Sequence, residues 1–239
     1  KDHPKVKAIV VNEQNSGSSF QQWKKGWEMA SFDWIWIAES DDTAAPNFLE
    51  ACANVIYYHE NLSLVCTQSN WIDAKGKEWY TRETGFEKEG FRDGRQVLEK
   101  WMIHENQIKN ASAVVFNKSK ADPAELETIS QYQWCGDWAL WNHLLLRGGF
   151  YFIDKPLNFF RRHAGMVSSK YYQNGFLYKE GLRISRRYQH LLDAGIATRM
   201  KTLASWSGHL LTQYRSNLKE GNWKVYLFAP LYYCALMHL

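Results

Sequence analysis

The chain has 239 residues, of which 45% are hydrophobic and 23% charged, as is typical of a packed globular protein. Its 29 Lys and Arg residues barely outnumber its 25 Asp and Glu residues and form no basic runs, so nothing indicates a nucleic-acid-binding protein. The four cysteines form no CxxC pair, which argues against a zinc finger or a disulfide scaffold and favours a reducing compartment.

The first part of the chain predicts strands that alternate with helices. The apolar, β-branched run at 7–12 predicts a buried parallel strand, and residues 18–31 have helical spacing. A second buried strand is expected at 34–38, a helix at 46–59 and a third strand at 62–66. This alternation is typical of an α/β protein with a mainly parallel sheet that helices cover on both faces.

Beyond residue 70 the pattern changes. A hairpin is expected over 71–79, followed by a loop that continues to Gly94. Further elements are expected in this order: a helix at 95–104, a strand at 112–116, a helix at 137–147, a strand at 150–154 and an all-helical region at 174–221. The uncharged stretch 225–239 is interrupted by Pro230 and is shorter than the ~20 residues of a membrane span, so it predicts a packing or membrane-surface helix.

Three carboxylates follow the predicted strand 34–38 directly, in the sequence Glu39-Ser-Asp41-Asp42. Ligands in open α/β sheets bind at the carboxyl ends of strands. Like charges that crowd together repel, and hard oxygen ligands suit Mg²⁺ or Mn²⁺, so the cluster predicts a site for one of these ions. The alternative is that Asp41 or Asp42 caps the helix that follows.

Asp137 lies between Trp134 and Trp138 at the expected start of a helix. Aromatic neighbours partly desolvate a carboxylate and raise its affinity for a proton, which suits a general base. Capping of the helix explains an Asp at this place equally well.

The third group of candidates is Arg161-Arg162-His163, at the end of an expected strand. Guanidinium and imidazole groups bind anionic phosphate. A pair of arginines exposed on the surface is the alternative.

Several of these motifs occur in the order and at the spacing seen in family 2 of the glycosyltransferases, which residues 5–169 resemble. The resemblance rests on Asn15-Ser-Gly17, Gly26, Glu39-Ser-Asp-Asp42 with Pro46, Gly136-Asp-Trp138, Pro156-Leu-Asn158 and Arg161-Arg-His163. It implies a GT-A-like domain over 1–169, followed by a helical region at 170–239. It also implies a nucleotide-diphosphate sugar donor, a saccharide or lipid-linked saccharide acceptor, and inversion at the anomeric carbon.

The resemblance assigns roles to particular residues. Asp41, Asp42 and Glu39 match the metal-binding element, where Glu39 replaces the usual first Asp and Asp41 is the first choice of ligand. Asp137 matches the catalytic base, with Gly136 in place of the usual Glu. The donor side is expected at Asn15, Gly17, Arg162 and His163, and the acceptor side at Asn106 and Trp138.

Family members normally begin with two further strand–helix units, which this sequence lacks. We expect a fragment of a longer chain, the alternative being a protein that has lost part of its donor pocket. The family implies a metal-dependent hexosyltransferase of polysaccharide or glycoconjugate biosynthesis, cytoplasmic and in peripheral contact with the inner face of the membrane. The rival hypotheses are a non-catalytic carbohydrate-binding or scaffold protein and a metal-dependent phosphotransferase, although no Walker-type phosphate loop is present.

Overall fold

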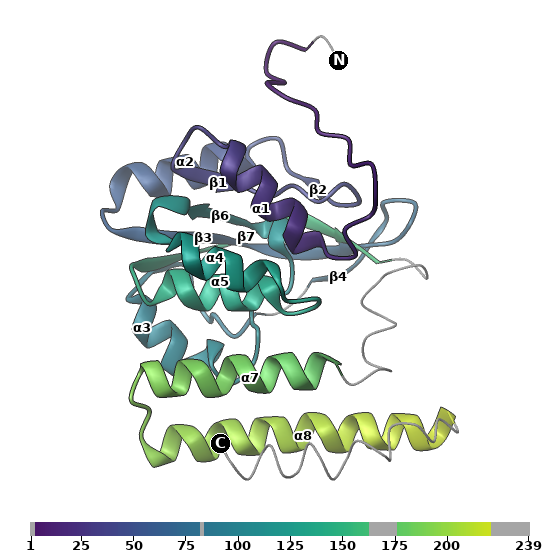
Figure 1. The fold of residues 1–239 in the computed structure, drawn as a ribbon, viewed down its shortest axis with the longest axis vertical. Helices are drawn as coiled ribbons and strands as arrows, with labels where there is room; N and C mark the ends of the chain where they lie inside the picture. Colours follow the sequence, from purple (N-terminus) through teal and green to yellow (C-terminus); the bar gives the residue numbers. More distant parts are fainter. Residues whose placement is uncertain (1–2, 82–83, 163–175, 221–239) are drawn as a thin grey trace.

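The computed structural model describes residues 3–81, 84–162 and 176–220 (Figure 1). Its strands are β1 (Trp34–Trp36), β2 (Thr43–Ala44), β3 (Leu62–Ile72), β4 (Glu78–Thr81), β5 (Gly90–Arg92), β6 (Val114–Asn117) and β7 (Gly149–Arg161). Its α-helices are α1 (Ser19–Met29), α2 (Phe48–Tyr58), α3 (Gly94–Val97), α4 (Pro123–Ser130), α5 (Gly136–Leu145), α7 (Phe176–Leu191) and α8 (Ile196–Glu220). Shorter helical turns are η1 (Leu98–Met102), η2 (Ala111–Ala113) and η3 (Lys118–Lys120).

The seven strands form one mixed sheet in the order β1-β6-β3-β7-β2, with β4 beside β3 and β5 beside β7. Among the strand pairs of the described chain, β3 and β7 alone run parallel, and every other pair is antiparallel. The prediction of a mainly parallel sheet was therefore wrong. A continuous apolar run shows that a strand is buried on both faces, but it does not show the direction of the neighbouring strand.

The expected strand at 7–12 is also absent from the described structure. Residues 6–12 are extended but unpaired, and Val10 and Val11 are 54% and 84% exposed. A strand exists only where a neighbouring segment pairs its backbone N–H and C=O groups, and the described chain offers none here. Residues 7–12 are apolar, as the sequence shows, but whether a segment pairs with another strand depends on the tertiary structure.

The other predicted helices and strands are present, several with different bounds. Strands β3 and β7 extend well beyond the predicted 62–66 and 150–154, and they carry the chain from the core to the rim of the sheet. Strand β5 was not predicted, because the stretch up to Gly94 was expected to be loop, and helix α4 and the short strand β2 were not predicted either. The C-terminal helices α7 and α8 confirm the expected helical region, while residues 225–239 and His163 lie outside the described residues.

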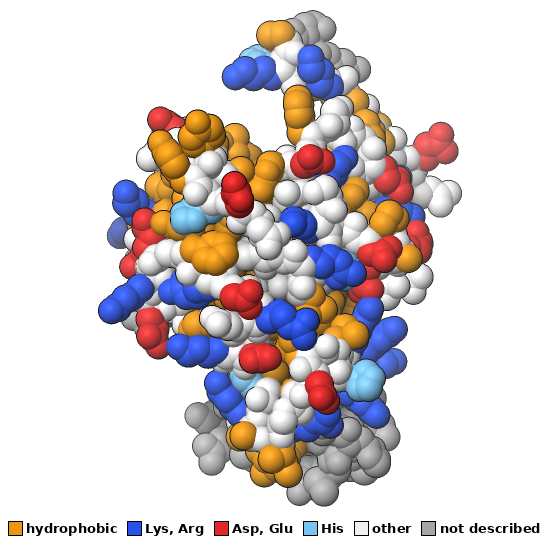
Figure 2. Space-filling view, turned by 90° about the vertical axis from the view of Figure 1, so that its left-hand side faces the viewer, with side chains coloured by type: hydrophobic (Ala, Val, Ile, Leu, Met, Phe, Trp, Pro, Cys, Tyr) orange, Lys and Arg blue, Asp and Glu red, His pale blue; other side chains and the backbone are white. Residues whose placement is uncertain are grey.

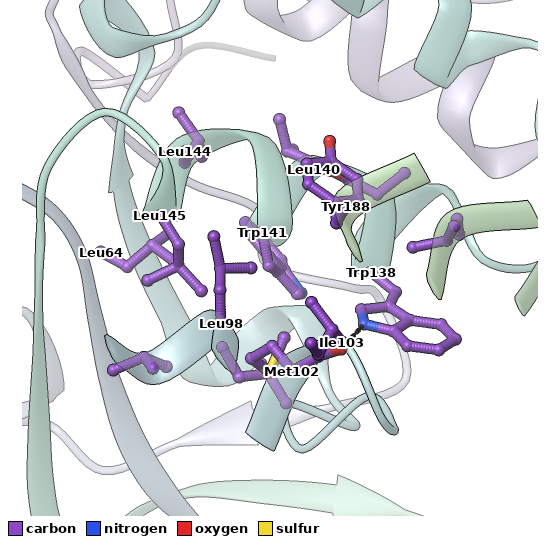
Figure 3. Close-up of a cluster of buried hydrophobic side chains, with 14 of the residues drawn as sticks. Leu64, Leu98, Met102, Ile103, Trp138, Leu140, Trp141, Leu144, Leu145 and Tyr188 are labelled. Atoms are coloured by element: carbon purple, nitrogen blue, oxygen red, sulfur yellow. Dashed lines mark hydrogen bonds between the residues drawn. The ribbon is translucent and has the colours of Figure 1, made fainter. Parts of the chain in front are cut away.

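The sheet separates two hydrophobic clusters. On one face α2 packs Phe48 and Cys52 against Val65, Val115 and Ile153 of the sheet. The other face carries the larger cluster, in which α5, η1 and α7 bury the side chains drawn in Figure 3, including Trp141, Met102 and Tyr188. Helices α7 and α8 lie beyond α5 from the sheet (Figure 1), and their Leu182, Ile184, Tyr188 and Trp206 belong to this same cluster.

The face of the molecule that Figure 2 presents has no large area covered by side chains of a single charge. Figure 2 shows basic and acidic side chains interspersed over the face it presents. No helix in the described part of the chain is both long enough and apolar enough to cross a bilayer. The cysteines in that part, Cys52, Cys66 and Cys135, are buried and form no disulfide.

Candidate functional site

An open cleft of about 1110 Å³ brings together segments that are far apart in the sequence. The segment before and at the start of α1 forms one side, the acidic turn after β1 forms another, and the segment leading into α5 forms a third. Of the predicted site residues, the cleft is lined by Asn15, Gly17, Glu39, Asp41 and Asp137. Asp41 and Asp137, to which the resemblance assigns the metal site and the base, therefore line the same cleft.

The acidic cluster is a turn at the carboxyl end of β1. The Asp42 backbone N–H donates to the Glu39 carbonyl at 3.2 Å, and the Glu39 N–H donates to Ser112 Oγ at 3.0 Å. Ser112 precedes the neighbouring strand β6, so pairing of β6 with β1 fixes the turn. Glu39 and Asp41 face the cleft as a result.

Asp42 has a different environment from its two neighbours, because it is not among the residues that line the cleft. Its Oδ1 accepts a hydrogen bond of 3.0 Å from the backbone N–H of Arg161, at the end of β7. Burial raises the pKa of this carboxyl. Asp42 thus joins the turn to β7, and its assignment as a metal ligand remains a prediction.

The capping alternative for this cluster does not hold in the structure. The N-cap of α2 is Asn47, and no side chain caps that helix. Neither Asp41 nor Asp42 is at a capping position. The carboxylates of the turn are therefore not explained by the helix that follows.

Arg161, which was singled out only as part of a basic cluster, fastens the acidic turn to the β3–β4 hairpin. Its Nε donates to the Asp41 carbonyl at 2.8 Å, and its Nη1 donates to the carbonyls of Asp73 and Ala74 at 2.9 and 3.3 Å. Its guanidinium thus binds backbone carbonyls instead of pointing into the cleft.

A buried network of polar side chains, centred on Asn158, also supports the acidic turn. Asn158 Oδ1 accepts from Asn110 Nδ2 at 2.7 Å and from Ser69 Oγ at 2.9 Å, and Asn158 Nδ2 donates to the Thr43 carbonyl at 3.4 Å. Because buried polar groups are costly without partners, these bonds fix β3, β7 and the segment after the acidic turn in one arrangement.

Asp137 is the second residue of α5, and the N-cap is Cys135, so Asp137 is not at the N-cap position. Asn106 Nδ2 donates to Asp137 Oδ2 at 3.1 Å, which places Asn106 beside the predicted base, while its role on the acceptor side stays a prediction. Burial raises the pKa of Asp137 to about 6, although hydrogen bonds from the Trp138 backbone N–H and from Asn106 and the positive charge of Lys109 act in the opposite direction. A carboxylate with a pKa near neutrality suits proton transfer.

Gly136 explains why the usual Glu before the base is absent. A Cβ at this position would lie 2.6 Å from Phe20 Cδ2 and Cγ, so the aromatic ring of α1 occupies the space of a side chain. The close approach of Phe20 joins α1 to the first turn of α5. It thereby links the two segments that line opposite parts of the cleft.

We expect Gly136→Ala to lower the free energy of unfolding by about 1–3 kcal/mol, as overpacking of a core typically does. Gly26→Ala is a matched control, since a Cβ at Gly26 of α1 meets nothing within 4 Å. Ala favours a helix over Gly by about 1 kcal/mol, so the control is expected to be neutral or stabilising. Urea unfolding of both variants measures the difference, and equal stability would show that Phe20 has room to move.

Glu39 has the charge environment expected near a bound cation. Burial, reinforced by the charges of Asp42, Asp137 and Asp41, raises its pKa to about 7. Within the described residues, no three His, Cys, Asp or Glu side chains lie close enough together to hold a metal ion by themselves. The acidic turn instead contributes two side chains to the cleft, Glu39 and Asp41, and Mg²⁺ commonly binds through one or two carboxylates together with phosphates and water.

Glu39 makes the stability of the protein depend on pH. Because its pKa rises from 4.5 in the unfolded chain to about 7 in the folded one, its stabilising contribution is complete below about pH 4.5 and is lost as the pH rises through about 7. Since one pKa unit corresponds to about 1.4 kcal/mol, we expect Glu39→Gln to be more stable than the unchanged protein at pH 8, by up to about 3 kcal/mol or roughly 6–12 °C in Tm. The difference is expected to vanish near pH 4.5. Thermal unfolding at both pH values tests this, with exposed Glu87→Gln as the control, and a Glu39 variant that is less stable at pH 8 would contradict it.

The loop before α1 has a backbone shaped by its own sequence. Asn15 Oδ1 accepts from the Gly17 N–H at 2.9 Å, and Gly17 has a φ of 74°, which favours glycine. Ser18 caps α1 by accepting from the Phe20 N–H. The N-terminus of α1 therefore opens into the cleft beside Asn15 and Gly17.

Besides Asp42, three described residues of the predicted site do not line the cleft: Arg162, Trp138 and Asn106, the last of which binds Asp137. The guanidinium of Arg162 lies 4.7 Å from the ring centroid of Trp71, in a cation–π contact. Trp138 is 3% exposed, and its indole donates to the Met102 carbonyl within the core (Figure 3). In this structure Trp138 contributes to packing, and the position of Phe160 and Trp134 in the cleft was not anticipated.

Comparison with known proteins supports the fold. No protein-family model and no curated protein matches the chain. Among solved structures, the chain is similar to the crystal structure of S. aureus TarS 1-349, a family 2 glycosyltransferase with the GT-A fold, with a TM-score of 0.56 and 14% sequence identity. The match covers 86% of this chain and 55% of that chain, so this chain spans about half of its length. The chain thus has a GT-A-like fold, as the resemblance implied, and at this identity the match shows the fold alone.

Proposed function

We propose that this GT-A-like chain belongs to a glycosyltransferase that transfers a sugar from a nucleotide-diphosphate donor to an acceptor hydroxyl with inversion. One observation carries the proposal: Glu39 and Asp41 after β1 and Asp137 at the start of α5 line the same cleft. The distant similarity in fold to a glycosyltransferase agrees with it.

In the proposed reaction Asp137 is the general base. The acceptor oxygen attacks the anomeric carbon, its proton passes to a carboxylate oxygen of Asp137, and the bond from the anomeric carbon to the diphosphate breaks with its electron pair on the leaving oxygen. Asn106 holds Oδ2 of Asp137 at 3.1 Å and so orients the carboxylate toward the acceptor side.

Glu39 and Asp41 would hold Mg²⁺ or Mn²⁺, which, when bound, offsets the negative charge of the departing diphosphate. Burial, together with the like charges nearby, raises the pKa of Glu39 to about 7, and these like charges support the assignment because a cation relieves their repulsion. Asp42 is better suited to hold the turn, given its hydrogen bond to β7.

The donor phosphates are proposed to lie between the acidic turn and the N-terminus of α1, whose first residues line the cleft together with Asn15 and Gly17. Backbone N–H groups at the start of a helix favour anions. Arg162 and His163 remain proposed donor residues on the strength of the resemblance, and Lys109 is a further cationic side chain that lines the cleft.

A direct test incubates the 239-residue chain with Mn²⁺ and a panel of nucleotide-diphosphate sugars. Calorimetry measures binding of the nucleotide diphosphate with and without the metal, and release of nucleotide diphosphate measures transfer. Metal-dependent nucleotide binding supports the transferase. Saccharide binding without any response to nucleotide would instead support a carbohydrate-binding protein derived from such an enzyme. A saccharide or lipid-linked saccharide acceptor, a place in polysaccharide biosynthesis and contact with the inner face of the membrane are further parts of the proposal.

A further inference from the structure

A carboxylate of the C-terminal helical region lies directly against the segment that leads into α5. Glu180 of α7 accepts hydrogen bonds from three successive backbone N–H groups: Gln133 to Oε1, and Trp134 and Cys135 to Oε2, each at 2.9 Å. Hydrogen bonds of N–H groups to an ionised carboxylate are stronger than those between neutral groups. One side chain therefore fixes the backbone of three consecutive residues.

These three residues lie at the edge of the cleft, immediately before α5. Gln133 and Trp134 line the cleft, and Cys135 is the N-cap of α5, which no side chain of its own segment caps. Asp137 follows two residues later. Helix α7 thus binds the N–H groups of the N-cap residue and of the two residues before it, so the backbone that leads to Asp137 is held by a helix far along the sequence.

Helix α7 is itself fixed in position. A Cβ at Gly181 would lie 2.3 Å from Trp206 Cη2, so the helix packs tightly against α8 at the residue next to Glu180. Further along α7, Tyr188 Oη donates to the Ala139 carbonyl of α5 at 3.1 Å. The carboxylate of Glu180 is therefore presented from a rigid helix, and its geometry is set before any ligand binds.

The same segment is also tied to the donor side of the cleft. Ser18 Oγ, in the cap of α1, donates to the Tyr132 carbonyl at 3.0 Å, and the guanidinium of Arg183 lies over the Tyr132 ring. Residues 132–135 are thus held between the cap of α1 and helix α7. A change at Glu180 is expected to loosen this segment from one side only.

We propose that Glu180 is a positioning residue for the base: its three hydrogen bonds hold residues 133–135 so that Asp137 stays half-buried beside Asn106. The inference rests on the proposed function of Asp137. It differs from a general contribution to stability, because it ties Glu180 to the titration of one carboxylate in the cleft.

The test uses Glu180→Gln and Glu180→Asp in the 239-residue chain. Gln offers one acceptor oxygen and turns an NH₂ group toward backbone N–H groups. Asp keeps the charge but is shorter by one C–C bond of about 1.5 Å. Both variants are expected to lower kcat about tenfold or more, with the KM for the donor changed less than about threefold. If the negative charge alone were responsible, Asp would behave as Glu does.

A second readout follows Asp137 directly, by NMR titration of its ¹³C-labelled carboxyl group. Burial holds its pKa at about 6, so loosening the segment is expected to move this value down toward the ordinary 3.8 in both Glu180 variants. Arg187→Gln is the matched control on the same helix, since it removes an ion pair with Glu125 and leaves residues 133–135 alone. It is expected to lower stability without moving the pKa of Asp137.

The outcomes separate the two hypotheses. If the unchanged protein transfers no sugar from any donor but the Glu180 variants still shift the pKa of Asp137, the proposed function fails and the positioning role stands. An unchanged pKa and kcat in Glu180→Gln, or an equal shift in Arg187→Gln, overturns the positioning role. Should the Glu180 variants not fold, hydrogen exchange of the unchanged protein decides: slow exchange of the Trp134 and Cys135 amides supports the role, and fast exchange overturns it.

Discussion

Replacing Asp137 by Asn is expected to lower turnover at least about a hundredfold, because general-base catalysis typically contributes 10²- to 10⁴-fold. Binding of the donor is expected to change less than about twofold, since the metal and phosphate side of the cleft is untouched. The fold is expected to survive, because the amide oxygen of Asn still accepts a hydrogen bond from Asn106. Steady-state kinetics and calorimetry of donor binding measure the two effects separately.

The pH profile gives the same hypothesis a second check. Since the base must be ionised and its pKa is about 6, kcat is expected to fall tenfold per pH unit below about pH 6 and to level off above it. Asp122→Asn is the matched control, because Asp122 caps α4 outside the cleft and Asn caps a helix equally well. Near-normal turnover in Asp137→Asn, or an acid limb that persists in it, would remove Asp137 from the role of base.

The second large effect is expected at Asp41, where Asn is predicted to weaken binding of the nucleotide diphosphate in the presence of Mn²⁺ by about a hundredfold. Metal stabilisation of phosphate charge contributes several kcal/mol, and about 3 kcal/mol corresponds to roughly this factor. Without metal, the variant and the unchanged protein are expected to bind the nucleotide equally weakly. Calorimetric titration at pH 7.5 with and without Mn²⁺ measures the difference.

Asp33→Asn provides the control for this prediction. Asp33 is an exposed carboxylate just before β1, while Asp41 follows the same strand at its cleft end. Removing a charge at Asp33 is therefore expected to leave metal-dependent binding within about twofold of normal. Equal losses in both variants would point to a general electrostatic effect and count against a metal site at Asp41.

Much of the candidate site was predictable because its residues are adjacent to recognisable elements. Glu39 and Asp41 directly follow an apolar strand, and Asp137 is flanked by two aromatic residues at the start of a helix. Strand ends and helix starts are visible in a local pattern. The sequence also allowed helix caps at these positions, and the structure assigns the N-cap positions to Asn47 and Cys135, although the Asp137 carboxylate still accepts from the Trp138 N–H in the first turn of α5.

The residues that hold the site in place were less visible. Ser112 and Arg161 bind the acidic turn through bonds that span 73 and 120 positions of sequence, and Glu180 reaches its amides across 45 to 47. No local pattern marks such partners, since any Ser, Arg or Glu satisfies the same composition. Likewise, the sequence around Gly136 does not show that an aromatic ring from another helix occupies the space in which a side chain would lie.

The amino-acid sequence by itself determined which segments are apolar, where most of the helices form, and which carboxylates stand at the ends of apolar segments, because these depend on neighbours within a few residues. Only the tertiary structure decided that the sheet is mixed, that residues 7–12 remain unpaired, and that Asp42 faces β7 while Asp41 faces the cleft. The physical reason is that strand direction, burial and pKa depend on which distant segments pack together. The sequence alone does not distinguish a carboxylate in apolar surroundings from one in water.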